Sequence, residues 1–189
     1  VIHENSVIAV HGKENIDSST IGRMVAIQKP KNLPSLNEEI LILGKEDEIW
    51  RNNSMEAFTS TPVYKDDRVY STVKRGELIC LDAGTGEEIW TLKLAPDQVH
   101  ASPTWADGKL FVPMFDGQVS VVKDIGKEGV IISQVQLDGS CLAAPAVAHG
   151  RVFVQSKKRL YCFGSNKVAP AFISHQSKKE LTSKKAVSL

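Results

Sequence analysis

The sequence has little cysteine, and its histidines form no metal-binding pattern. Cys80, Cys141 and Cys162 are the only cysteines among 189 residues; they lie far apart and form no CxxC pair. A sparse, odd-numbered set of this kind argues against a disulfide framework and against a zinc site. The five histidines show no HxH or HExxH spacing, so we interpret them as solvated loop residues.

Long apolar runs and an excess of one charge are also missing. No stretch approaches the roughly eighteen apolar residues of a membrane span. Lysine and arginine total 23 against 22 acidic residues, which leaves a net charge of +1. This balance gives no reason to expect a nucleic-acid or acidic-membrane partner.

What the sequence does contain is an internal repeat. Three segments align on Pro62, Pro103 and Pro145, which follow one another at spacings of 41 and 42 residues. This period is typical of β-propeller blades rather than of helical repeats. A fourth copy begins at Val1, inside its first strand, so we expect the chain to be part of a longer protein.

Each copy has the pattern of short strands joined by tight turns. Turns such as 106–108 contain Asp and Gly, which tolerate the positive φ of a tight hairpin. Second strands such as 110–112 are apolar at consecutive positions, as expected for a sheet covered on both faces. The predicted fold class is therefore all-β, a partial β-propeller of about 3.5 four-stranded antiparallel blades.

The repeat also predicts the organisation of the chain. We expect a run of propeller blades over 1–166, followed by a basic, disordered tail over 167–189. The predicted blades are 1–53, 54–96, 97–139 and 140–166, and the last one lacks its outer strand. The first blade carries 8 extra residues before Gly22 and 14 extra residues between Gly22 and Trp50, which we expect to form polar loops at opposite ends of the blade.

The second blade contains the segment CLDAGTGEEIW (80–90), which resembles the tryptophan-docking motif of PQQ-type (pyrroloquinoline-quinone-type) propeller repeats. The residues that match the motif are Asp82, Thr85, Gly86 and Trp90. We expect Asp82 and Thr85 to close the hairpin by hydrogen bonds and Gly86 to take the strained turn position. Trp90 is expected to pack on the next blade, and Trp50, in a similar context 40 residues earlier, to dock in the same way.

The cysteines are expected to serve packing. Cys80 and Cys162 occupy equivalent third-strand positions, which favours buried, small apolar side chains over reactive thiols. Cys141 lies near the entry to an inner strand, a more open position, and we expect it to serve packing as well.

The resemblance covers roughly residues 1–166 and implies a fold more firmly than a function, because propellers host many unrelated activities. The family includes quinone-dependent alcohol dehydrogenases and a cofactor-free branch, such as the periplasmic propeller lipoprotein of the outer-membrane β-barrel assembly machinery. A quinone enzyme is expected to carry two adjacent cysteines, a Ca²⁺ set of Glu, Asn and Asp, and a catalytic Asp near the axis. No two cysteines are adjacent in this sequence.

We therefore predict a non-catalytic scaffold of the cofactor-free branch, with no catalytic, cofactor-binding or metal-binding residues. It would bind another protein through loops on a propeller face, its open blade edges would tend to self-associate, and the resemblance implies a periplasmic location. Two alternatives stay open. The chain is part of a quinone-dependent dehydrogenase whose active site lies on other blades, or it is the sensor region of a larger signalling protein.

Overall fold

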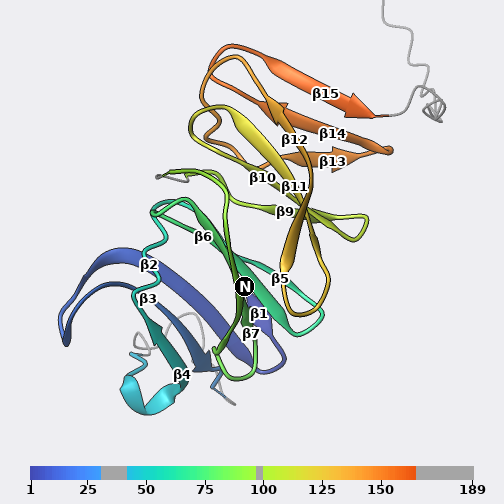
Figure 1. The fold of residues 1–189 in the computed structure, drawn as a ribbon. Helices are drawn as coiled ribbons and strands as arrows, with labels where there is room; N and C mark the ends of the chain where they lie inside the picture. The colour runs from blue at the N-terminus through green and yellow to red at the C-terminus, as the bar shows by residue number, and fades with distance from the viewer. Residues whose placement is uncertain (31–41, 97–99, 165–189) are drawn as a thin grey trace, which may run out of the picture.

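The computed structural model describes residues 1–30, 42–96 and 100–164, and these residues form four antiparallel sheets (Figure 1). The sheets follow the order of the chain and stack face to face like the blades of a fan, from blade 1 at the blue end to blade 4 at the orange end. This arrangement confirms the all-β, partial-propeller prediction. The only helical element in the described ranges is one 3-10 turn, η1 (Lys45–Asp47), and nothing there has the length and apolarity needed to cross a membrane as a helix.

The first two blades are four-stranded meanders in which consecutive strands pair. Blade 1 consists of β1 (Ile2–His3), β2 (Ser6–Asn15), β3 (Ser18–Gln28) and β4 (Glu48–Asn53). Blade 2 consists of β5 (Val63–Lys65), β6 (Arg68–Val73), β7 (Glu77–Asp82) and β8 (Glu88–Lys93).

The last two blades differ in strand number. Blade 3 consists of β9 (Thr104–Ala106), β10 (Lys109–Pro113), β11 (Gln118–Asp124) and β12 (Gly129–Gln136). Blade 4 consists of β13 (Ala146–Ala148), β14 (Arg151–Gln155) and β15 (Leu160–Gly164), with no outer strand among the described residues. The tail predicted over 167–189 lies outside the described residues.

Tight hairpins join the first two strands of the blades. In blade 2 the turn residues Asp66 and Asp67 have φ of 48° and 57°, and in blade 3 Asp107 and Gly108 have φ of 49° and 68°. Positive φ at both central positions is what a two-residue hairpin turn needs to match the twist of its strands. Asp and Gly tolerate this conformation, which is why the DD and DG dipeptides mark these turns in the sequence.

The first insertion of blade 1 is not a loop, contrary to the sequence-based expectation. It lengthens β2 and β3 into a long hairpin whose tip carries Asp17, and Arg23 and Arg51 both donate hydrogen bonds to that carboxylate. Those bonds hold the pKa of Asp17 well below its usual range. The second insertion contains residues 31–41, outside the described part, and leaves the sheet at the opposite end from Asp17, as expected.

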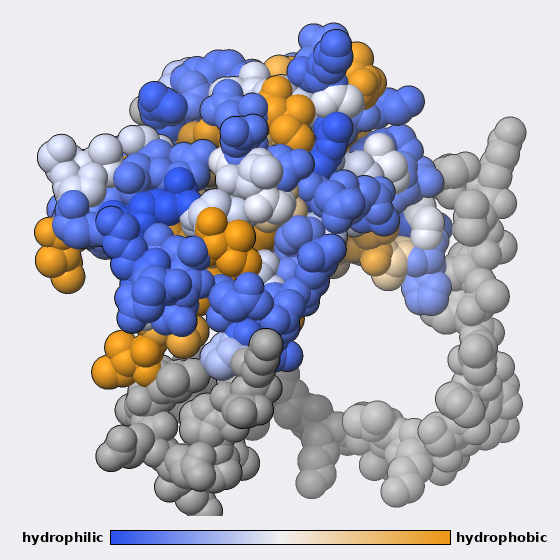
Figure 2. Space-filling view, turned by 90° about the horizontal axis from the view of Figure 1, so that it is seen from below, coloured by the Kyte–Doolittle hydropathy of each residue, from blue (hydrophilic) through white to orange (hydrophobic). Residues whose placement is uncertain are grey.

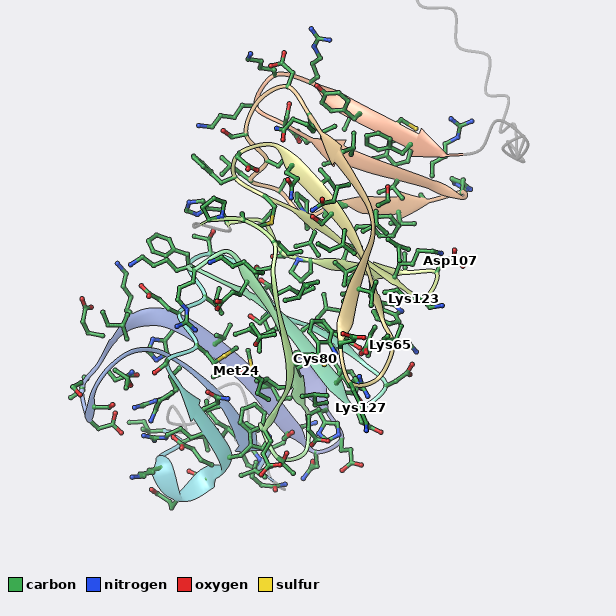
Figure 3. All side chains as sticks on the ribbon, viewed as in Figure 1. Met24, Lys65, Cys80, Asp107, Lys123 and Lys127 are labelled. Atoms are coloured by element: carbon green, nitrogen blue, oxygen red, sulfur yellow. The ribbon has the colours of Figure 1, made fainter. Side chains whose placement is uncertain are left out.

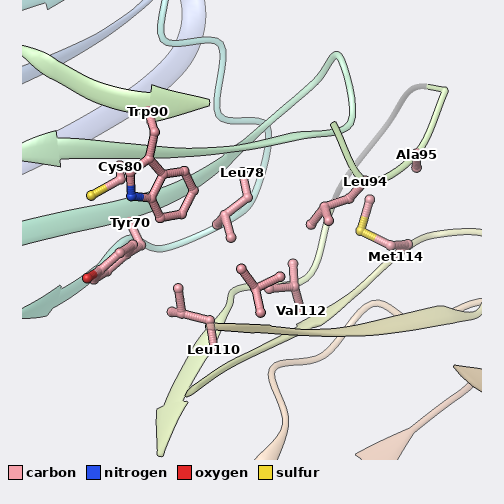
Figure 4. Packing of buried hydrophobic residues seen from close by; sticks show 10 residues of the cluster. Tyr70, Leu78, Cys80, Trp90, Leu94, Ala95, Leu110, Val112 and Met114 are labelled. Atoms are coloured by element: carbon pink, nitrogen blue, oxygen red, sulfur yellow. The ribbon is translucent and has the colours of Figure 1, made fainter. Parts of the chain in front are cut away.

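Three apolar cores lie between successive blades. The strand β7 shows how they arise, because its alternate residues face different neighbours: Ile79 and Leu81 belong to the core shared with blade 1, whereas Leu78 and Cys80 belong to the core shared with blade 3 (Figure 4). Burying each large apolar side chain stabilises the fold by about 1.5–3 kcal/mol. The consecutive apolar residues in the sequence therefore reflect a sheet covered on both sides.

The outward side of blade 1 shows a different composition. Seen from that side, the surface is largely hydrophilic, with separate hydrophobic patches between polar side chains (Figure 2). Ile2, Val7 and Ile49 of blade 1 are among the exposed apolar residues. The apolar residues of this blade are therefore concentrated on its inner face, toward blade 2.

One of the three cysteine expectations is wrong. Cys80 and Cys141 are fully buried and pack in cores as expected, but Cys162 is exposed. Cys162 lies on β15, which no further sheet covers in the described residues, whereas Cys80 lies at the equivalent position of a blade covered on both sides. Cys141 forms an isolated β-bridge with Ser156 and packs in the core between blades 3 and 4.

Candidate functional site

A single carboxylate closes the hairpin between β7 and β8. Oδ1 of Asp82 accepts hydrogen bonds from the backbone N–H of Gly84 and of Thr85, both at 2.9 Å, and from Oγ1 of Thr85 at 3.2 Å. Oγ1 of Thr85 in turn accepts from the N–H of Glu87 at 3.3 Å. Gly86 follows with a φ of +72°. Side chains thus satisfy backbone donors that the turn leaves unpaired.

The indole of Trp50, on β4 of blade 1, lies directly on this hairpin of blade 2. A Cβ atom on Gly86 would come within 2.3 Å of Cε3 of Trp50, so the ring fills the space that a side chain would need. Nε1 of Trp50 donates to the carbonyl oxygen of Ala83 at 2.9 Å. Gly86 is therefore required twice, for its backbone conformation and for the approach of the ring.

Trp90, on β8 of blade 2, makes the same kind of contact with blade 3. Its ring lies over Gly129, where an added Cβ would come within 2.8 Å of the indole, and only 5% of the residue is exposed. Nε1 of Trp90 donates to Oδ1 of Asp124 at 3.2 Å. The five residues singled out from the sequence thus divide between two junctions. Trp50 lies on the hairpin of the following blade that Asp82, Thr85 and Gly86 shape, and Trp90 belongs to the next junction.

Asp124, which the sequence did not single out, is the centre of the junction between blades 2 and 3. Its Oδ2 accepts hydrogen bonds from Nη1 of Arg68 at 2.6 Å and from the hydroxyl of Tyr70 at 2.7 Å. Its side chain is 7% exposed. Burial raises the pKa of Asp124, but hydrogen bonds from Tyr70, the N–H of Gly126 and Arg68 outweigh that effect and lower the pKa. A buried carboxylate with this many donors stays ionised and links the two blades.

These groups leave little scope for chemistry at the junctions. Burial is the main cause that raises the pKa of Cys80 to about 12, so its thiol stays protonated at neutral pH. Arg68 and Tyr70 both donate to Asp124, and none of these three residues lines the hollows described below. Within the part of the chain that the structure describes, no three or more His, Cys, Asp or Glu side chains group closely enough to hold a metal ion.

A different arrangement lies at the end of the blades where the turns between second and third strands emerge. Phe58 and His100, from the connections between blades, and Phe115, from the β10–β11 turn, form what we call the aromatic row. The centroids of Phe58 and His100 lie 5.4 Å apart and those of His100 and Phe115 lie 5.2 Å apart, both pairs edge to face. The ammonium of Lys74 lies 5.9 Å from the Phe58 centroid, and that of Lys157 lies 5.8 Å from the Phe115 centroid.

A shallow hollow lies at each end of the aromatic row. The hollow at the Lys74 end has a volume of about 190 Å³ and is lined by Ile21, Ser54, Glu56, Val73, Lys74 and Arg75. The hollow at the Lys157 end has a volume of about 200 Å³ and is lined by Ser140, Leu142, Ala143, Gln155, Ser156 and Lys157. The row and its hollows together cross all four blades and include three exposed apolar side chains, those of Ile21, Phe58 and Leu142.

Comparison with known proteins agrees with the blade geometry. Residues 37–129 match a family model described as outer membrane protein assembly factor BamB. The matched residues, about half of the chain, are therefore similar to PQQ-type propeller repeats. In these repeats the indole contacts of Trp50 and Trp90 join one blade to the next. A search of curated proteins found none that matches the chain.

Solved structures support the same fold. BamB from Moraxella catarrhalis is 14% identical, with a TM-score of 0.55 over 84% of this chain and 47% of that chain. The computationally designed Ika4 protein is also 14% identical, with a TM-score of 0.61 over 86% of this chain and 87% of that chain. The chain thus spans about half the length of that BamB chain. At these identities the likeness to both structures shows the propeller fold alone.

Proposed function

We propose that this chain of PQQ-type repeats is a non-catalytic scaffold that binds another protein during outer-membrane protein assembly, in the periplasm. The family description names such an assembly factor. The observation that carries the proposal is the aromatic row, because aromatic side chains that gather on connecting loops of a rigid scaffold are typical of protein-binding surfaces. Phe58, at 45% exposed, is part of that row rather than of a core.

The blade junctions supply the rigidity that such a surface needs. The row takes its residues from connections that belong to different blades, so its geometry depends on how the blades are held together. Trp50 and Trp90 fix blade 1 to blade 2 and blade 2 to blade 3 through buried ring contacts and indole hydrogen bonds. A surface whose side chains are already positioned loses less conformational entropy on binding.

Complementation tests the proposal. The complete protein would be expressed in a Gram-negative strain that lacks its own BamB, and the level of folded outer-membrane proteins would be measured. We expect the natural sequence to restore that level and the double variant Phe58→Ser, Phe115→Ser to fail. Ile132→Ser is the matched control, because Ile132 is 48% exposed but lies on β12, away from the row, and this variant is expected to complement.

Two results would overturn the proposal. One is complementation by the double variant as strong as that by the natural sequence. The other is catalysis: if the complete protein, loaded with pyrroloquinoline quinone and Ca²⁺, reduced an artificial electron acceptor in the presence of alcohols or sugars, the chain would be part of a dehydrogenase.

A further inference from the structure

The aromatic row and its flanking lysines form one continuous line across the surface. Successive separations from the Lys74 ammonium through the three ring centroids to the Lys157 ammonium are 5.9, 5.4, 5.2 and 5.8 Å. At a rise of about 3.3 Å per residue, this line is at most as long as about seven residues of extended chain. A hollow continues it at each end. The dimensions therefore fit an extended peptide segment.

The line is aromatic in the middle, and the hollow beyond each end contains one exposed apolar side chain. The ring pairs lie edge to face, at 89° for Phe58 with His100 and 62° for His100 with Phe115, so successive rings present both faces and edges along the line. Ile21 and Leu142, both 46% exposed, lie in the two terminal hollows. A bound segment would thus find aromatic contacts at its centre and an exposed apolar side chain near each of its ends.

The charge along the line is uneven. The ammonium of Lys74 lies 2.9 Å from Oε1 of Glu56, so its charge is already balanced. Lys157 has no salt bridge to any residue that the structure describes, and its neighbour Lys158 is paired with Asp138 at 2.7 Å. The Asp116 carboxylate accepts from the N–H of Gln118 and forms no salt bridge with Lys157. The uncompensated positive charge of the line therefore lies at the blade 4 end.

We propose that the aromatic row binds an extended segment of a partner protein that is apolar or aromatic at its centre and carries carboxylates at the end that reaches Lys157. The proposal rests on the proposed protein-binding function and names the chemistry of the partner. A carboxylate next to Lys157 gains a charge-assisted contact at the rim of the surface, while the rings supply the apolar contact.

A nucleic acid is a poorer fit to the same line. Binding of a nucleic-acid strand depends on several cationic side chains that each neutralise a phosphate. Here Lys74 is paired with Glu56, and Nε of Arg75 lies 3.2 Å from Oε2 of Glu77. Lys157 is therefore the uncompensated cation among the described residues that flank the row. A peptide with a few carboxylates matches this charge, whereas a regular polyanion does not.

Fluorescence polarisation with three labelled nine-residue peptides tests the proposal. All three carry a phenylalanine at the centre flanked by serine and valine, and they differ only in the last two residues, which are Glu, Gln or Lys. With the complete protein, we expect the Glu peptide to bind about fivefold more tightly than the Gln peptide, and the Lys peptide to bind most weakly. Equal affinity for the Glu and Gln peptides would overturn the proposal.

Variants of the protein locate the binding. Lys157→Glu is expected to reverse the order of the three peptides, whereas Lys74→Gln should change it less, because Glu56 already balances Lys74. The matched control is Lys127→Glu, since Lys127 is an exposed lysine of the β11–β12 turn, at the opposite end of the blades (Figure 3). If Lys127→Glu changed the order of peptide affinities as much as Lys157→Glu does, only the net charge of the protein would matter, and the proposal would be wrong.

The aromatic contribution is tested separately from folding. Phe58→Ser should lower the affinity for all three peptides by about tenfold, and Phe58→Tyr, which keeps the ring, should preserve the affinity. Because Phe58 is exposed, both variants are expected to melt like the natural protein. If the protein binds the peptides selectively but does not complement, the assembly function is wrong and the peptide site stands. If it complements but does not distinguish the peptides, the function stands and the peptide site is wrong.

Discussion

The junction between blades 2 and 3 and the junction between blades 3 and 4 are built differently, although the same repeat forms both. At the first, Trp90 lies over Gly129 and a buried carboxylate accepts bonds from blade 2. At the second, Ser133 occupies the position that corresponds to Trp90. Both residues lie on the outer strand of their blade, and both pair with the third strand directly beside a β-bulge. The buried core there consists of only Val119, Leu137, Cys141 and Val154.

The second junction relies more on polar contacts near the surface. Oγ of Ser156 donates to the carbonyl oxygen of Asp138 at 2.7 Å, and Lys158 forms a salt bridge with the Asp138 carboxylate. Both charged side chains of that salt bridge are at least half exposed, so the pair contributes little stability. The two indole contacts each have two partners, a Trp in one blade and a Gly in the next blade, either in the turn before the outer strand or at the first residue of that strand.

Thiol reactivity should show the largest difference between the two regions. Cys80 and Cys162 occupy equivalent positions, but burial raises the pKa of Cys80 to about 12, whereas Cys162 is exposed. We expect Cys162 to react with a maleimide at least about a hundredfold faster than Cys80 and Cys141 in the folded protein. Mass spectrometry of the labelled peptides measures this. Comparable rates before unfolding would mean that blade 3 does not cover blade 2.

Gly86→Ala should cause the largest loss of stability. The new Cβ would collide with Trp50 and hold an L-residue at a φ of +72°, which together should lower the free energy of unfolding by about 3 kcal/mol in a urea titration. Gly108→Ala is the control, because Gly108 has a φ of +68° but no atom within 4 Å of its Cβ position. That variant should lose only about 1 kcal/mol. Equal losses would show that the indole contact adds nothing to the backbone strain.

Asp124→Asn should lower the free energy of unfolding by about 2 kcal/mol at pH 7, because it leaves Arg68 without its anionic partner. The pKa of Asp124 in the folded protein lies below the ordinary value of 3.8, so the stabilisation by its charge is present above that value and is lost as the pH falls below it. The difference in the free energy of unfolding between the variant and the natural protein, measured by urea titration, should therefore shrink as the pH is lowered below 3.8. Asp138→Asn, at the weaker junction, should change the free energy of unfolding much less than Asp124→Asn, because both side chains of its salt bridge are at least half exposed.

Ser133→Trp should have the smallest effect. This substitution adds the missing indole, but blade 4 offers no outer strand and no matching Gly among the described residues. We expect the free energy of unfolding to change by no more than about 0.5 kcal/mol, and the new indole to show the fluorescence of a solvent-exposed Trp. A gain of about 2 kcal/mol or more would mean that a Trp alone can dock a blade.

The propeller could be predicted from the sequence because its signals are local and repeated. Pro62, Pro103 and Pro145 mark the period, and consecutive apolar residues on second and third strands indicate sheets covered on both faces. The sequence also contains the signal for the Trp50 and Trp90 contacts, since the two tryptophans lie 40 residues apart in similar contexts and a Thr-Gly turn precedes Trp90.

What could not be predicted depends on contacts between blades or on turn length. The hairpin before Gly129 is two residues longer than the one before Gly86, and Asp124, at the position that corresponds to Ala83, binds the Trp90 indole through its side chain rather than through its backbone carbonyl. The exposure of Cys162 depends on the absence of a covering sheet among the described residues, which its own strand pattern does not reveal. The aromatic row draws on two connections between blades and on a turn within blade 3, so no local pattern joins its members.

The alternating contacts of β7 have a consequence for how the protein responds to damage. Since Ile79 and Cys80 are adjacent on the strand but serve different cores, a shift of this one strand disturbs the packing on both sides of blade 2 at once. Interior blades of such an array gain stability from two neighbours and terminal blades from one. Amide hydrogen exchange is therefore expected to begin at β15, and protection should be lost from blade 4 inward, with blade 2 opening last.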